Sequence, residues 1–156
     1  MMRMVSDTTA SAQPTPSSKS SSRRRVAVLV AGDTLMFLLF AVLGRRTHGE
    51  ASGPAALAQI ALTALPFALG WFLIAPFVGA FRRARTTTVA RMVVTSELSW
   101  LLAWPAALVL RWILAADHRV PLSFALVVLA VNGVLLGLWR GLFAFVEHDS
   151  RLPWRR

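Results

Sequence analysis

Four long apolar blocks dominate this sequence and restrict the folds open to it. They cover about residues 26–43, 55–81, 89–114 and 121–146. At about 1.5 Å per helical residue, each is long enough to cross a hydrocarbon core of roughly 30 Å, the first only just. In lipid a spanning segment must satisfy its backbone hydrogen bonds internally, which an open sheet cannot do. We therefore predict an all-α fold, an integral membrane four-helix bundle.

The composition agrees with a membrane protein. Of the 156 residues 56% are hydrophobic and only 15% are charged, whereas a soluble domain is usually about a quarter charged. The chain has no cysteine, which excludes disulfides, thiolate metal sites and cysteine nucleophiles. The connections between the blocks are short and leave no room for a soluble domain.

The two ends of the chain are polar. Residues 1–25 are rich in Ser, Thr and Pro, and such a segment buries too little apolar surface to order itself, so we predict a disordered cytoplasmic tail. Residues 147–156 form a short basic tail. A cleaved signal peptide is the rival interpretation of the first apolar block. Its length, the presence of Asp33 and the basic segment 44–46 after it argue against cleavage.

The net charge of +10 could suggest nucleic acid, but the basic residues cluster at the ends of the apolar blocks. There they are better interpreted as topology signals and contacts to anionic lipid headgroups. With the N-terminus inside, the outer loops hold three of them, Arg45, Arg46 and Arg119. The cytoplasmic segments hold twelve: Arg3, Lys19, Arg23, Arg24, Arg25, Arg82, Arg83, Arg85, Arg91, Arg151, Arg155 and Arg156. This bias predicts a cell inner (plasma) membrane protein with both termini in the cytoplasm.

Three charged residues lie inside the apolar blocks at a similar expected depth. Asp33, Glu97 and Arg140 each fall roughly 10 Å from the cytoplasmic end of their helices. An unpaired charge there costs at least about 2.5 kcal/mol, so we predict that Asp33 or Glu97, or both, contacts Arg140. Asn132 shares the helix face of Arg140. The cluster is either a structural ion pair that selects helix neighbours or a proton-, ion- or substrate-linked site.

Small residues recur beside that face. Gly133, Gly137 and Gly141 form a doubled small-xxx-small stripe, which permits close helix approach. The stripe could pack within one chain or could join two copies as a homodimer.

Basic side chains also gather near the expected outer face. Arg45, Arg46, His48 and Arg111 could together meet an anionic headgroup or ligand. His48 and His118 lie in the two outer loops, but loop histidines are mostly solvated, so we predict no metal site. No histidine lies within the four apolar blocks to ligate a haem, and we expect no cofactor.

The order of several short motifs resembles a known family. These are Gly32-Asp33, the segment 44–49, Pro66-Phe67 with Gly70-Trp71 and Pro76, Trp104-Pro105 with Arg111, and Trp139-Arg140. Together they resemble a family of small bacterial and archaeal membrane proteins known as domain of unknown function 3054 (DUF3054). The resemblance covers about residues 26–145. It implies a four-span membrane protein and supplies no activity.

The sequence contains no Gly-rich phosphate loop, no metalloprotease helix motif and no serine placed with an embedded histidine. We therefore expect no enzyme, but a non-enzymatic accessory or structural subunit of a membrane complex. The alternative is a small proton- or ion-coupled transporter that uses Asp33, Glu97 and Arg140. A third possibility is a membrane enzyme that binds lipid headgroups at the outer basic residues.

Overall fold

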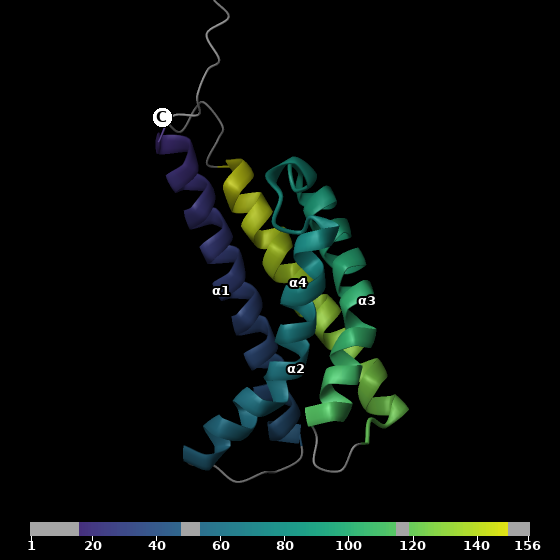
Figure 1. Cartoon of the computed structure of the whole chain (residues 1–156). Coiled ribbons are helices and arrows are strands. Elements are labelled where there is room, and N and C mark those ends of the chain that lie inside the picture. Colours follow the sequence, from purple (N-terminus) through teal and green to yellow (C-terminus); the bar gives the residue numbers. More distant parts are fainter. Residues whose placement is uncertain (1–15, 48–53, 115–118, 150–156) are drawn as a thin grey trace, which may run out of the picture.

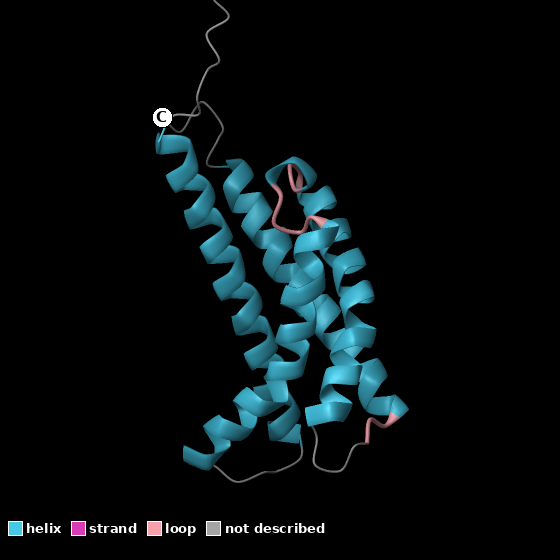
Figure 2. Ribbon diagram, in the orientation of Figure 1, coloured by secondary structure: helices cyan, strands magenta, loops and turns pink. Residues whose placement is uncertain are grey.

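Four helices pack side by side in the computed structural model, which describes residues 16–47, 54–114 and 119–149 (Figure 1). The helices are α1 (Pro16–Thr47), α2 (Pro54–Val78), α3 (Val89–Leu114) and α4 (Leu122–Asp149), with a short 3-10 turn η1 (Arg83–Arg85) between α2 and α3. All regular structure in the described part of the chain is helical (Figure 2). The predicted all-α four-helix bundle is confirmed.

Each helix contains a stretch long and apolar enough to cross a membrane. These stretches are Ser21–Arg45, Ala56–Val78, Val89–Leu114 and Leu122–Asp149. Many large apolar side chains point away from the core, such as Leu57 and Leu138, and in water such a surface would be unusual. Against lipid chains it is the expected surface, so the chain is a multi-pass membrane protein.

The helix boundaries differ from the prediction mainly at the two ends of the chain. α1 begins at Pro16 and not at residue 26, so residues 16–25 are helical where the sequence predicts a disordered tail. α4 likewise continues to Asp149, into the predicted C-terminal tail. A tertiary contact stabilises the turns next to the two spans: Arg25 on α1 forms an ion pair with Glu147 on α4 at 2.9 Å. The rest of the two predicted tails, residues 1–15 and 150–156, lies outside the described residues.

Local signals define the other helix ends. α3 spans the predicted residues 89–114, and its first turn is capped by Thr88, whose Oγ1 accepts the Arg91 backbone N–H at 3.3 Å. α2 ends three residues before the predicted residue 81, because Gly79 adopts a left-handed conformation with φ of 92°. The first turns of α2 lie at an angle to the rest of the helix (Figure 1), as expected with Pro66 inside it.

The helices form a closed ring in which α1 and α2, α2 and α3, α3 and α4, and α4 and α1 are in contact. Large aromatic side chains fill the centre: the ring of Phe37 lies 5.7 Å from Trp100 and 6.4 Å from Trp71, centroid to centroid. Small residues bring the helices close at other points. At Gly70 of α2, an added Cβ would lie only 2.9 Å from the Ala107 Cα of α3.

Candidate functional site

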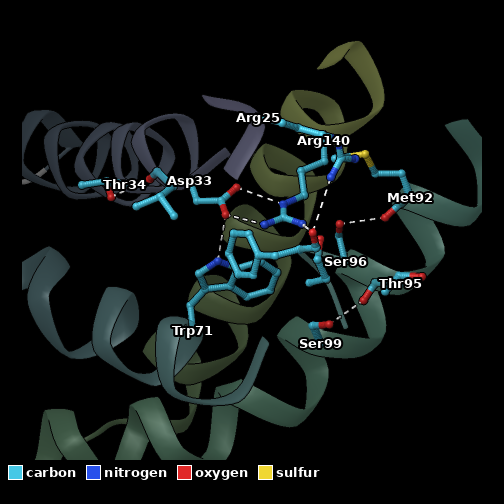
Figure 3. Close-up of polar contacts among 12 residues, drawn as sticks. Arg25, Asp33, Thr34, Trp71, Met92, Thr95, Ser96, Ser99 and Arg140 are labelled. Atoms are coloured by element: carbon cyan, nitrogen blue, oxygen red, sulfur yellow. Dashed lines mark hydrogen bonds and ion pairs between the residues drawn. The ribbon is translucent and has the colours of Figure 1, made fainter. Parts of the chain in front are cut away.

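A buried ion pair between Asp33 and Arg140 occupies the interior of the bundle (Figure 3). Arg140 Nε donates to Asp33 Oδ1 at 3.0 Å, and Nη2 donates to Oδ2 of the same carboxylate. Both side chains are 0% exposed. Of the two contacts of Arg140 predicted from depth, the one with Asp33 is thus present.

The helical periodicity of α1 and α4 places the two groups inside. Along α1 the buried residues Leu29, Asp33 and Phe37 recur every four positions. Along α4 the same spacing carries the buried residues Val128, Asn132, Leu136, Arg140 and Ala144. A four-residue spacing keeps side chains on one helix face, so the face that builds the core also carries the charge.

Trp71 of α2 is a third member of this site, and sequence reasoning did not assign it there. Its indole N–H donates to Asp33 Oδ2 at 3.0 Å. Its ring also lies beneath the arginine, with the Arg140 Cζ 5.0 Å from the ring centroid, a cation–π distance. α2 therefore contributes directly to the charged site.

The turn after α2 supplies the remaining partners of Arg140. Gly79 and Ala80 form a Schellman motif: the Ala80 N–H donates to the Ala75 carbonyl at 3.0 Å and the Gly79 N–H to the Pro76 carbonyl at 3.2 Å. This motif aims the Ala80 carbonyl at the bundle interior, where it accepts Arg140 Nη1 at 2.6 Å. The Phe81 ring covers the guanidinium, with its centroid 4.7 Å from Cζ.

The resulting site is electrically balanced and closed. One carboxylate faces one guanidinium, and hydrogen bonds from α2 and its turn satisfy further lone pairs and protons. A buried pair of this kind is tolerable in low dielectric only with such extra partners. Within the residues described, no group of three His, Cys, Asp or Glu side chains could hold a metal ion.

Glu97 does not join this cluster. Its carboxylate lies against α4 at Gly133 and Gly137, where an added Cβ would be 3.1 Å from Oε2 and 2.7 Å from Oε1, respectively. A three-residue cluster across α1, α3 and α4 is therefore not formed, although the pair Asp33–Arg140 is. The reason is the rotation of α3 about its own axis. Ser96 and Trp100 face the core, and Glu97 lies beside that face, where α3 meets α4.

Asn132 lies on the same face of α4 as Arg140, and the glycine stripe lies beside that face, as the sequence predicts. The Asn132 side chain is fully buried and donates to the Val128 carbonyl at 3.1 Å. Gly133, Gly137 and Gly141 face side chains of α3, so they pack within this chain. Whether they also meet a second copy stays a prediction.

Of the predicted outer basic cluster, the structure describes the side chains of Arg45 and Arg111. Arg45 donates to the Gln59 side chain of α2, whereas Arg111 lies over the Phe124 ring of α4, 5.8 Å from its centroid. The two arginines thus make different contacts. The side chains of Arg46, His48 and His118 lie outside the described residues, so the cluster and its histidines stay predictions.

A second polar network closes the opposite end of the bundle, which we call the Arg25 end. Arg25 donates through Nε to Glu147 at 2.9 Å and through Nη2 to the Thr86 hydroxyl at 2.8 Å. Arg83 reaches the other carboxylate oxygen of Glu147 at 3.3 Å. Sequence reasoning missed this network because it interpreted Arg25 as a topology charge in a disordered tail.

The comparisons with known proteins agree with the resemblance drawn from the motifs. The model of a family described as protein of unknown function (DUF3054) matches residues 30–143, so the chain belongs to this family. The matched range contains the Asp33–Arg140 pair and Trp71. No curated protein and no solved structure matches the chain.

Proposed function

We propose that this chain is a non-enzymatic helical module that serves as an accessory or structural subunit of a larger membrane complex. The observation that carries the proposal is the enclosure of its ion pair. Asp33 and Arg140 are 0% exposed, whereas a catalytic or transport group must meet a substrate, an ion or water. The pair joins α1, α2 and α4 and so favours one arrangement of the bundle.

We further propose that the chain lies in the inner (plasma) membrane of the cell. In the proposed orientation, the Arg25 end is on the cytoplasmic side. The excess of basic residues in the segments at that end supports it. Because the chain has no cysteine, single cysteines can report the sidedness. Ser22→Cys should react with an impermeant maleimide only after the cells are opened, and Ser123→Cys should react in intact cells.

A small proton- or ion-coupled transporter is the second candidate, and Glu97 is the observation in its favour. The Glu97 carboxylate has no hydrogen-bond or ion-pair partner among the described residues, so one titratable group in the spans is not neutralised. The enclosure of the other two charges weighs against a pathway through all three. Proton flux into vesicles that hold the purified chain, read with a pH-sensitive dye, would favour transport if Glu97→Gln abolished it.

Affinity purification of the full chain from native membranes tests the leading proposal. A membrane protein recovered in fixed stoichiometry is expected. Leu73→Ala, at an exposed position of α2, should retain it and serves as the matched control for Arg140→Leu, which should lose it along with the bundle. Recovery of the folded wild-type chain alone would overturn the proposed role.

A further inference from the structure

A groove runs along the lipid-facing surface of the bundle, between α3 and α4. Its volume is ≈ 730 Å³, and it is lined by apolar side chains with Glu97 as its charged residue. Leu138 and Leu142 stand on its α4 side and are 68% and 59% exposed. The lining runs along α4 from Gly133 to Phe145, roughly 18 Å at 1.5 Å per residue, so its shape is that of a trough for an elongated partner.

The glycines of α4 form the floor of this groove and carry the Glu97 carboxylate. An added Cβ at Gly137 would meet Glu97 Oε1, and one at Gly141 would lie 3.3 Å from Val93 Cγ2. Without side chains of their own, these positions leave space both for the carboxylate and for the backbone of another helix. The groove therefore joins two features of helix association in membranes, a small-residue floor and a polar group.

The Glu97 carboxylate has no partner in the part of the chain that the structure describes. In the described residues it makes no hydrogen bond and no ion pair, because Arg140 is already held by Asp33 and Ala80. Lipid chains cannot hydrogen-bond a carboxylate, and acidic groups inside a membrane characteristically pair with a basic group or face a polar cavity. None of the described residues of this chain supplies such a donor, so a basic group of another protein would satisfy the carboxylate.

We infer that the groove binds a transmembrane helix of a different protein, which presents a lysine or arginine to Glu97. This inference rests on the proposed role as a subunit of a membrane complex and names the surface and the partner's chemistry. A partner helix with small residues on the same face would approach the glycine floor and place its cation beside the carboxylate.

A second copy of this chain fits the groove less well. None of the residues that line it is basic, so a symmetric pair would place two Glu97 carboxylates together without a cation. Arg91, an exposed basic residue of α3, lies six positions before Glu97, about 9 Å along the helix. There it reaches the headgroups more readily than another copy's carboxylate.

The test uses the purified full chain in phosphatidylcholine vesicles and a defined probe. The probe is a synthetic helix of about 20 residues, alanine along one face and leucine elsewhere, with a central lysine and a terminal photo-crosslinker. A matched helix carries leucine in place of the lysine. Crosslinking is mapped by mass spectrometry. Attachment at α3 and α4 is the site-specific signal. Attachment at Leu35 of α1 is the background, since α1 does not contact α3.

The lysine helix should crosslink to α3 and α4 at least tenfold more than the leucine helix. Glu97→Gln should remove that difference, whereas Glu97→Asp should retain part of it. Because Glu97 has no partner among the residues described, both variants should melt at the wild-type temperature. Gly137→Val provides a second, steric block of the groove.

Equal crosslinking of the two helices, or no effect of Glu97→Gln in a folded chain, would overturn the inference. Crosslinks between two copies through this groove that the lysine helix cannot displace would replace it with a homodimer. Failure of the subunit role looks different, because the lysine helix would bind in vesicles while purification from native membranes returned the chain alone. A native partner recovered equally well with Glu97→Gln would retain the subunit role and reject the groove.

Discussion

The guanidinium of Arg140 lies alongside the carboxylate of Asp33, with Nε 3.0 Å from Oδ1 and Nη2 hydrogen-bonded to Oδ2. Two parallel hydrogen bonds fix the plane of the arginine as well as its position. The third nitrogen of the guanidinium, Nη1, is thereby directed to the carbonyl of Ala80, in the turn that follows α2. The orientation of one side chain on α4 therefore depends on α1 and on the turn that ends α2.

Removal of both charges should destabilise the bundle by less than the sum of the two single removals. Arg140→Leu leaves the Asp33 carboxylate buried without its counter-ion, and breaking a buried pair in this way costs about 3–5 kcal/mol. In the double variant Asp33→Leu, Arg140→Leu no charge is stranded, so its loss should be smaller than the sum of the single losses. Denaturant unfolding in detergent, followed by circular dichroism, measures the three values.

Simple additivity of the two single losses would contradict the coupling. Arg140→Lys provides a control for charge alone. It keeps the cation but cannot form two parallel bonds, so it should recover only part of the wild-type stability.

Trp71→Phe should weaken the site without emptying it. The phenyl ring retains an aromatic face beneath Arg140 but loses the N–H that donates to Asp33 at 3.0 Å. A hydrogen bond to a charged group contributes about 1.5–3 kcal/mol, and the loss of unfolding free energy should fall in that range. Trp100→Phe is the matched control: its N–H donates to the Leu129 backbone carbonyl, which also belongs to the helical ladder of α4, so its loss should be smaller. A larger loss at Trp100 would contradict the role given to Trp71.

Gly79→Ala should disturb the turn that presents Ala80. Its φ of 92° is unfavourable for any residue with a Cβ, and the new Cβ would lie 2.8 Å from the Arg85 Cδ. The strain should cost about 1–3 kcal/mol and should shift the Ala80 carbonyl from Arg140. Gly44→Ala is the control, because nothing lies within 4 Å of a Cβ there. Alanine in a helix is favoured over glycine by roughly 0.5–1 kcal/mol, so Gly44→Ala should raise the melting temperature or leave it unchanged, and Gly79→Ala should lower it.

Depth and hydropathy explain which features could be predicted from the sequence. Continuous apolar blocks require membrane-spanning helices, and a similar depth for Asp33 and Arg140 makes their pairing favourable before any neighbour is known. Depth says nothing about rotation, however. Glu97 shares the approximate level but lies at the α3–α4 seam, because Ser96 and Trp100 occupy the core side of α3.

The partners from α2 could not be predicted for a different reason. The role of Trp71 requires knowledge that α2 lies between α1 and α3, and the role of Ala80 depends on a backbone turn and not on a side chain. Gly79 was the available signal for that turn, since a glycine after an apolar block often ends a helix in the left-handed conformation. Arg25 was misassigned because a basic residue next to a span serves equally well as a topology signal.

Arg25 and Arg24 are adjacent arginines with different surroundings, so they test whether Arg25 is more than a topology charge. Arg25 is buried and contacts Glu147 and Thr86, whereas Arg24 is exposed. Arg25→Gln should lower the unfolding free energy by about 1.5–3 kcal/mol because it removes charge-assisted hydrogen bonds. Arg24→Gln removes the same charge from the same segment and should change it by less than about 0.5 kcal/mol. Thermal unfolding of both variants in one detergent measures the difference, and equal effects would mean that Arg25 acts through net charge and not through its contacts with α4 and the α2–α3 turn.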